Sequence, residues 1–427
     1  MSDTVNFQNY LKTGDLVVVA QLGAEPTTLT TALFDAARTV EGVRVLTSFP
    51  LGEATARLAS KHLSFLSMDG FGANGRLFEE GRLGVAPARF SDYSRLFEAR
   101  LKPAITLCSV TMPDAEGNVS LGVTVDHLPA AIREAQFAFA EINPAMPWTN
   151  GDAVLPLSAF TKTIKAQSPP AEWASRTPGP IDHAVAANVA RLVPDKATVQ
   201  YGVGSLPDAV AAALSKKRDL GLHSGSFADS IVDLVDAGAV SNKYKEIDPG
   251  KHVATALYGS RRLYDFVDRN PDLLMRAGTY THSAKTLENF ETFFAINSAL
   301  EVDLTGQVGA EAANGRYLGA IGGQLDFHRA GFLSPKGRGI IALSSTAGKA
   351  NKTKIVAKLS GPVTAPRADA DTVVTEHGIA ELCGLTLEER AEALIAIAAP
   401  GARAALDRKS TRLNSSHSSV SRMPSSA

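Results

Sequence analysis

The sequence contains very little cysteine. Only two occur in 427 residues, Cys108 and Cys383, and neither belongs to a CxxC motif or lies near a group of histidines. A disulfide scaffold and a structural zinc site both need several cysteine or histidine side chains at short spacings, so this pattern argues against both. We therefore expect a protein without a metal site that works in a reducing compartment.

The sequence also lacks an excess of charge of either sign. Its 43 Lys and Arg residues are balanced by 44 Asp and Glu residues, which gives a formal net charge of −1. Nucleic acid and anionic membranes are not expected as partners, because both are bound through a surplus of basic groups. No apolar run approaches the roughly 18 residues of a membrane span. The first ten residues, MSDTVNFQNY, lack the basic and apolar regions of a signal peptide, so a cytoplasmic location is expected.

Short apolar runs alternate with helical patterns along the chain. With 44% hydrophobic and 20% charged residues, the composition is that of a globular protein with two domains or one large one. Helices are predicted over 207–219 and 386–398, the second opening with the Thr386–Glu389 spacing of a capping box. Buried strands are predicted in the ranges 15–23, 43–49, 197–204, 339–345 and 371–378. This alternation predicts an α/β fold with a mainly parallel sheet.

An internal repeat indicates two related halves. The segment QLGAEPTTLTTAL (21–33) aligns with GVGSLPDAVAAAL (202–214), and both follow a valine-rich strand. A proline-rich stretch between 168 and 180 is the best candidate for a linker. We therefore expect an N-terminal α/β domain over 1–180 and a C-terminal α/β domain over 181–407. The serine-rich residues 408–427 have almost no apolar side chains and are expected to form a disordered or artefactual tail.

Two glycine-rich loops are the candidate ligand-binding elements. In YGVGSLPDAV (201–210), Gly202 and Gly204 precede a predicted helix, whose unpaired N–H groups favour a negatively charged ligand. The dinucleotide fingerprint would need glycine where Pro207 stands, and no P-loop GK[ST] follows. The loop can be an oxyanion or carboxyl pocket, or an ordinary tight turn between a strand and a helix.

The second loop, YLGAIGGQLDFHRAG (317–331), places the Gly322–Gly323 pair among polar residues. Asp326 and His328 are expected to shape this loop rather than to perform chemistry. Four lysines follow further along the chain, and they form either a solvated edge or a cradle for the phosphates of a nucleotide-like cofactor. These are Lys349, Lys352, Lys354 and Lys358.

Several motifs resemble one known family. They are GVGSLPDAV, AINSALEVDLTGQV, GAIGGQLDF, IIALSSTA and DTVVTEHGIAELCGLTLEERAEALIAIA, with GDLVVVAQLGAEPTTL and AEINPAMPWTNGDAVLPLS nearer the N-terminus. Together they resemble the acetyl-CoA hydrolase/transferase family, a group of family I CoA-transferases that includes 4-hydroxybutyrate CoA-transferase. The resemblance extends in order over about residues 10 to 406.

The resemblance implies two similar open-sheet α/β domains of the CoA-transferase type, with acyl-CoA bound between them. In this family a loop glutamate attacks the thioester, forming an acyl-glutamyl anhydride and then a glutamyl-CoA thioester, and a carboxylate acceptor or water completes the turnover. The loop that matches residues 202–206 donates backbone hydrogen bonds to the oxyanion. The implied CoA-binding residues are Gly202, Val203, Gly204, Ser205, Leu206, Asn297, Gly322 and Gly323.

The family's nucleophile is missing from this sequence. Where the family reads His-Ser-Glu, the chain reads His223-Ser224-Gly225, and these three residues are expected to line the acyl site. A glycine cannot form the anhydride, so we assign no catalytic residue. Because His223 and Ser224 are neighbours on an extended segment, their side chains are expected to point to opposite sides.

We expect a CoA-transferase or acyl-CoA hydrolase that acts on a small acyl group without the usual glutamate. The alternative is a catalytically inactive paralogue or partner subunit that binds CoA or acyl-CoA. A third possibility is an enzyme for a CoA ester whose own carboxylate replaces the glutamate. The expected partners are acyl-CoA, a small carboxylate and a second copy of the chain in a homodimer.

Overall fold

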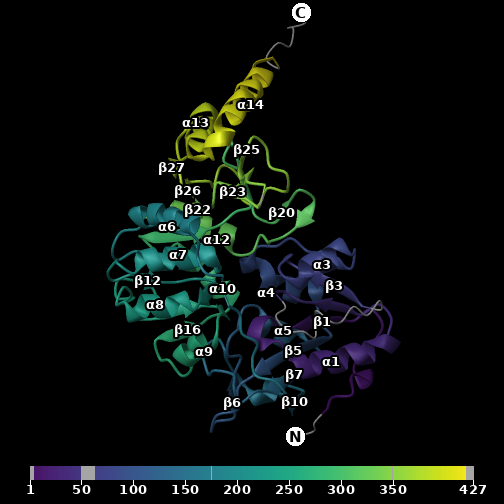
Figure 1. Ribbon diagram of the computed structural model, residues 1–427. Coiled ribbons are helices and arrows are strands. Elements are labelled where there is room, and N and C mark those ends of the chain that lie inside the picture. Colours follow the sequence, from purple (N-terminus) through teal and green to yellow (C-terminus); the bar gives the residue numbers. More distant parts are fainter. Residues whose placement is uncertain (1–3, 50–62, 175, 349, 420–427) are drawn as a thin grey trace, which may run out of the picture.

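The N-terminal half of the chain forms a sheet of seven parallel strands (Figure 1). The computed structural model describes residues 4–49, 63–174, 176–348 and 350–419. In sheet order the strands are β10 (Lys162–Lys165), β7 (Phe137–Ile142), β5 (Ile105–Val110), β1 (Leu16–Val19), β2 (Arg44–Leu46), β3 (Ser64–Ser67) and β4 (Leu83–Val85). Every residue of β1 and β5 is buried, as expected for parallel strands with both faces covered.

The α-helices among the described residues of this half are α1 (Thr27–Ala36), α3 (Ala73–Glu79), α4 (Tyr93–Leu96) and α5 (Leu128–Glu134). A short antiparallel pair, β6 (Asn118–Ser120) with β9 (Val154–Pro156), lies beside the sheet.

The C-terminal half contains a second open sheet of six strands. In sheet order they are β12 (Gly221–Leu222), β11 (Thr198–Tyr201), β17 (Phe293–Asn297), β22 (Arg338–Ala342), β26 (Thr372–Thr375) and β27 (Gly378–Glu381). All neighbours are parallel except β26 and β27. The class expected from sequence, two open-sheet α/β domains, is therefore confirmed.

The helices of the second half are α6 (Pro180–Leu192), α7 (Ser205–Leu214), α8 (Ser230–Asp236), α9 (Arg261–Val267), α10 (Gly278–Thr281), α11 (Ala284–Leu287), α12 (Gln324–Leu333), α13 (Leu387–Ile397) and α14 (Pro400–Ser419). Its remaining short strands are β13 (Ser226–Ala228), β14 (His252–Ala254), β15 (Ala256–Tyr258), β16 (Leu273–Met275), β18 (Glu301–Asp303), β19 (Val308–Gly309), β20 (Ala312–Ala313), β21 (Arg316–Tyr317), β23 (Thr346–Ala347), β24 (Lys352–Thr353) and β25 (Ile355–Val356).

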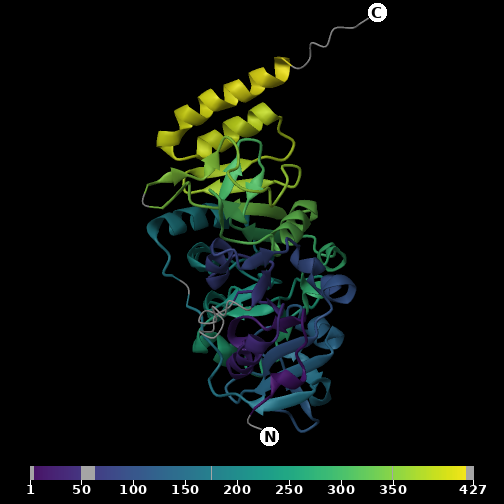
Figure 2. The ribbon, with the colours of Figure 1, turned by 90° about the vertical axis from the view of Figure 1, so that its right-hand side faces the viewer.

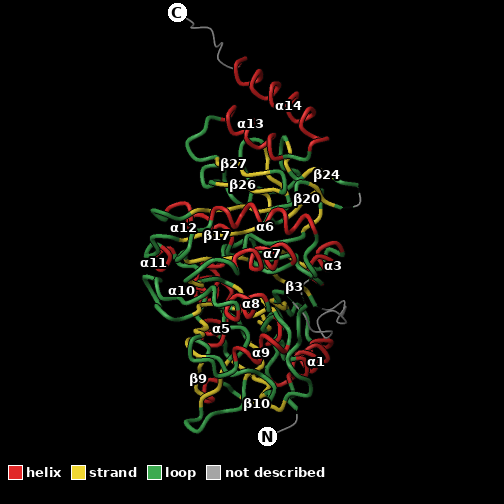
Figure 3. Tube along the Cα trace, turned by 60° about the vertical axis from the view of Figure 1, so that its left-hand side comes forward, coloured by secondary structure: helices red, strands yellow, loops and turns green. Residues whose placement is uncertain are grey.

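The local sequence signals correspond to the observed elements. Each of the five predicted strand ranges overlaps a strand, namely β1, β2, β11, β22 and β26, and the two predicted helices overlap α7 and α13. The capping box at the start of α13 is present: Glu389 N–H donates to Thr386 Oγ1, and Thr386 N–H donates to the Glu389 carboxylate. Figure 3 shows helices distributed along both halves around the strands.

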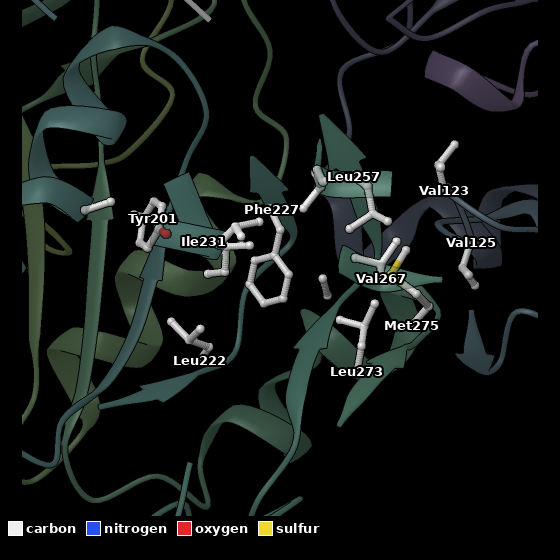
Figure 4. Close-up of a cluster of buried hydrophobic side chains, with 14 of the residues drawn as sticks. Val123, Val125, Tyr201, Leu222, Phe227, Ile231, Leu257, Val267, Leu273 and Met275 are labelled. Atoms are coloured by element: carbon white, nitrogen blue, oxygen red, sulfur yellow. The ribbon is translucent and has the colours of Figure 1, made fainter. Parts of the chain in front are cut away.

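A shared apolar core joins the two halves. In the largest cluster of buried side chains, Val123 and Val125 of the first half pack with Leu257 and Met275 of the second (Figure 4). Strands cross the boundary as well, because β8 (Asn150–Gly151) pairs with β16 in a three-stranded sheet completed by β14. The segment that follows the His223–Gly225 loop is thus packed against the N-terminal half.

The proline-rich stretch before residue 180 is bound to the second half. The Tyr264 hydroxyl donates a hydrogen bond to the carbonyl oxygen of Ala171 (2.7 Å), and Trp173 N–H donates to that of Gly259 (2.9 Å). At its end, α6 begins at Pro180 and packs against α7. Within the described ranges, no helix has both the length and the apolar character that crossing a membrane requires.

The C-terminal end differs from the expected unstructured tail over 408–427. Helix α14 continues through that boundary to Ser419, and it lies beside α13 at one end of the molecule (Figure 2). The start of α14 is packed, since Leu406 is buried in the same cluster as Leu394 of α13. Once a helix is nucleated by such packing, each further residue adds a local hydrogen bond, so polar residues can extend it. Residues 420–427 lie outside the described part of the chain.

Candidate active site

A cavity of about 520 Å³ lies between the two halves. It opens at the carboxyl ends of β11 and β17, the edge at which open α/β sheets bind ligands. The first half contributes Gln21, Ser48, Phe49, Asp69, Phe71, Phe90 and Tyr93. The second half contributes the two glycine loops together with Gly225, Tyr258, His282, Asn297 and Phe327.

The first glycine loop forms one wall of the cavity. All five residues expected there, Gly202, Val203, Gly204, Ser205 and Leu206, line it between the end of β11 and the start of α7. Gly204 has a φ of +121°, a conformation that L-residues rarely adopt, while an added Cβ would meet no atom within 4 Å. Glycine is therefore required here by its backbone conformation rather than by crowding. The N–H groups of Ser205 and Leu206 precede the first hydrogen bond of the ten-residue helix and are free to bind an oxyanion.

Asn297, expected to lie along CoA, is on the cavity wall at the end of β17. Its side-chain amide exchanges hydrogen bonds with Gln200 of β11, at 3.0 Å and 3.3 Å. No motif in the sequence pointed to Gln200. The pair fixes both amides at the rim of the sheet, so that their remaining donor and acceptor capacity is available to a ligand.

The second glycine loop closes the cavity against the N-terminal half. Gly322, with a φ of +54°, accepts a hydrogen bond from Phe90 N–H (2.9 Å), and Asp326 accepts from both the amide and the hydroxyl of Ser91. Burial raises the pKa of Asp326 to about 6. His328 is fully buried. The expectation that Asp326 shapes this loop fits these contacts.

The described lysines downstream of this loop do not line the cavity. Lys352, Lys354 and Lys358 are absent from its wall, and Lys349 lies outside the described residues. Lys354 is instead largely buried near Glu376, and desolvation lowers its pKa to about 8.

Of the three residues expected to line the acyl site, only Gly225 lies on the wall of the cavity. His223 is fully buried, with Nε2 at 2.9 Å from the carbonyl oxygen of Thr281, and desolvation lowers its pKa to about 3. The Ser224 hydroxyl donates to the carbonyl oxygen of Tyr201 (3.1 Å). These two neighbours face different surroundings, as the extended segment predicts, but both point into the protein. The expectation that His223 and Ser224 line the acyl site is therefore corrected.

An unexpected imidazole stands beside Gly225. A Cβ added to Gly225 would lie 2.7 Å from Nε2 of His282 and 2.9 Å from its Cε1. A Cβ on Gly323 would also collide with this nitrogen. The space that a larger residue at position 225 would need is thus filled by His282, whose pKa burial holds well below its usual value. The sequence THSAK around His282 carries no motif, and only the fold brings it to the cavity.

Asp69 is the acidic side chain of the cavity wall, and no motif in the sequence pointed to it either. Its Oδ1 accepts hydrogen bonds from Asn74 Nδ2 and Phe71 N–H, both at 3.0 Å. Burial nevertheless raises the pKa of Asp69. Burial, with a smaller effect of the Asp69 charge, raises the pKa of Tyr93 well above its usual value, so this phenol stays protonated at neutral pH.

Fold and cavity together define a two-domain α/β protein with a cavity between the domains, at the ends of parallel strands and beside a helix N-terminus. Residues 9–194 match the model of the acetyl-CoA hydrolase/transferase N-terminal domain, and residues 259–410 match that of the C-terminal domain. The chain belongs to the acetyl-CoA hydrolase/transferase family, as the motifs in the sequence predict.

Individual relatives agree with this assignment. The chain is 36% identical to 4-hydroxybutyrate coenzyme A transferase of Clostridium kluyveri, over 91% of this chain and 92% of the relative. The crystal structure of RipA from Yersinia pestis superimposes with a TM-score of 0.90 at 29% identity, over 96% of both chains. A 4-hydroxybutyrate CoA-transferase from Porphyromonas gingivalis superimposes with a TM-score of 0.80 at 31% identity, over 95% of both chains.

Proposed function

We propose that this protein binds an acyl-CoA with a small acyl group in the cavity and hydrolyses its thioester without a glutamyl–enzyme intermediate. The observation that carries the proposal is the pairing of an intact loop over 202–206 with a glycine at 225. The loop offers N–H groups to a developing oxyanion. Gly225 offers no side chain that could attack the thioester, and the adjacent space is occupied by the His282 ring.

In this proposal the thioester carbonyl oxygen faces the N–H groups of Ser205 and Leu206, and pantetheine runs past Asn297 and the Gly322–Gly323 pair. These elements line one continuous cavity. A transferase would need a nucleophile that holds the acyl group while CoA and the acceptor exchange roles. Without one, water is the simplest attacking group.

The proposal is tested by incubating the full chain with acetyl-, propanoyl- and butyryl-CoA and following free thiol release. Hydrolysis is expected for at least one ester, at a rate that does not change when acetate or another carboxylate is added. Acyl-CoA binding should be measured calorimetrically in parallel. Acceptor-dependent acyl exchange would contradict the proposal in favour of a transferase. Binding without thiol release would contradict it in favour of a non-catalytic acyl-CoA-binding protein.

A further inference from the structure

We propose that His282 is the general base of this site and activates the attacking water from the place next to Gly225. This inference rests on the proposed function, because it names the group that makes hydrolysis feasible without the glutamate. Its first support is steric. Both Gly225 and Gly323 lie so close to Nε2 of His282 that neither position has room for a Cβ. The ring and the two glycines are therefore packed against one another, and all three line the cavity.

The imidazole is held in one orientation from three sides. The Phe90 ring of the N-terminal half stacks on it at 4.3 Å between centroids, and the Phe327 ring of α12 lies against it at 4.4 Å. Its Nδ1 is 2.7 Å from the hydroxyl oxygen of Thr281. A base whose ring is fixed by packing and by a second polar group has the arrangement expected of an activated pair.

The Thr281 hydroxyl oxygen lies 2.7 Å from Nδ1 of His282 and 3.4 Å from the carbonyl oxygen of Ala277. In the tautomer that this proposal requires, Nδ1–H donates to the Thr281 oxygen and the hydroxyl proton is directed to the Ala277 carbonyl. This tautomer leaves the lone pair on Nε2, the atom that lies beside Gly225. A neutral imidazole with a free lone pair can take a proton from water.

The chemical step balances with water as the co-reactant. Nε2 takes one proton from water while the water oxygen forms a bond to the thioester carbon, and the negative charge passes to the carbonyl oxygen beside the loop over 202–206. When the tetrahedral intermediate collapses, the C–S bond breaks and the thiolate of CoA takes the proton from the imidazolium. The products are the carboxylic acid, which ionises in solution, and CoA.

The other candidate bases fit less well. His223 is turned away from the cavity, with Nε2 on the Thr281 carbonyl oxygen. Asp69 does line the cavity, but it lies on the N-terminal wall and is held by Asn74. Asp69 is the residue to examine if the acyl group is found on the protein.

The test compares wild type with His282→Asn and with a control, His183→Asn, whose side chain is exposed on α6 and far from the cavity wall. General bases typically contribute about 10²–10⁴-fold to a rate. Because burial lowers the pKa of His282 and so weakens it as a base, we expect a loss of kcat at the lower end of this range, about 100-fold, in His282→Asn. The acyl-CoA dissociation constant should change less than about threefold. The control should match wild type. Unchanged kcat in His282→Asn, while wild type hydrolyses, would overturn this inference and leave the proposed function standing. No hydrolysis by wild type would overturn the proposed function itself.

A second pair of variants keeps the inference testable if His282→Asn fails to fold. Gly225→Glu alone should form no adduct with acyl-CoA, because the ring occupies the space that the new side chain needs. Gly225→Glu combined with His282→Ala should form a glutamyl adduct, trapped with borohydride and located by mass spectrometry of the peptide over 219–230. An adduct in the single variant, or an acyl group on Asp69 of the wild type, would refute the assignment of His282.

Discussion

The contact between Gly225 and His282 can be measured as a coupling free energy of unfolding. In Gly225→Ala the new methyl group would lie 2.7 Å and 2.9 Å from two atoms of the imidazole and 3.3 Å from the Phe327 ring. The imidazole has little room to move away from the new methyl group, because the Phe90 and Phe327 rings pack against it. Forcing an extra methyl group into a packed site typically destabilises a protein by about 1–3 kcal/mol, and we expect a loss in that range.

The assay is a double-mutant cycle with Gly225→Ala, His282→Ala and the double variant, each unfolded in urea and followed by circular dichroism. Once the imidazole is gone, Gly225→Ala should change the free energy of unfolding by less than about 0.5 kcal/mol, so almost the whole loss should appear as coupling. Gly202→Ala is the matched control on the same cavity wall, since its Cβ would meet its nearest atom at 3.9 Å. If Gly225→Ala destabilises both backgrounds equally, the steric reasoning is wrong.

Three further predictions concern other parts of the molecule. Gly204→Ala should introduce about 1–3 kcal/mol of backbone strain at a φ of +121° and a ψ of 179°, and it should weaken acyl-CoA binding in calorimetry. Gly238→Ala, at a φ of +70° after α8, should be strained by about 1–2 kcal/mol without loss of affinity, and equal affinity in both variants would move the ligand elsewhere. Burial raises the pKa of the Glu141 carboxyl to about 7 from 4.5, so between these pH values the folded state retains a proton that the unfolded chain releases, and stability from this group falls as pH rises. Glu141→Gln retains an oxygen that can accept the Leu29 N–H. In this variant the free energy of unfolding, measured by urea titration at several pH values, should fall less steeply as pH rises. An unchanged dependence on pH would contradict the role given to the Glu141 carboxyl. Removing residues 408–427 should leave Tm and acyl-CoA affinity unchanged, because the buried Leu406 is retained; a Tm several degrees lower would show that the removed part of α14 contributes to stability.

The fold was predictable from sequence wherever its signals are local. Runs such as residues 16–19 of β1 are apolar throughout because both faces of a parallel sheet are covered, and Thr386 with Glu389 identifies a helix start within four residues. The loop over 202–206 was predictable for the same reason, since a strand, two glycines and a helix follow one another directly. The continuation of α14 beyond residue 407 was missed, because composition alone does not show that a packed helix precedes the polar segment.

The centre of the cavity was not predictable, because its contacts join distant parts of the chain. His282 lies beside Gly225 although the two residues are 57 positions apart in the sequence. Phe90, from the other half of the molecule, stacks on the His282 ring. Nothing in THSAK distinguishes this histidine from a buried structural one such as His223. Conversely, the polar sequence around His223 and Ser224 led to the prediction that both line the acyl site, although both side chains point into the protein. Side-chain direction at the end of a two-residue strand depends on packing that the sequence does not encode locally.

The apolar core that runs from one half into the other constrains how a ligand can reach the cavity. Swinging the halves apart about a hinge would bring Val123, Val125 and their partners Leu257 and Met275 into water, and each such side chain would cost about 1.5–3 kcal/mol. Hinged separation of the halves, as occurs in loosely joined domains, is therefore energetically unfavourable for this protein. Phe71 and Leu318, which line the cavity, are 40% and 37% exposed and so mark where it meets solvent. The core shared by the two halves therefore favours entry of a ligand at this opening, without separation of the halves.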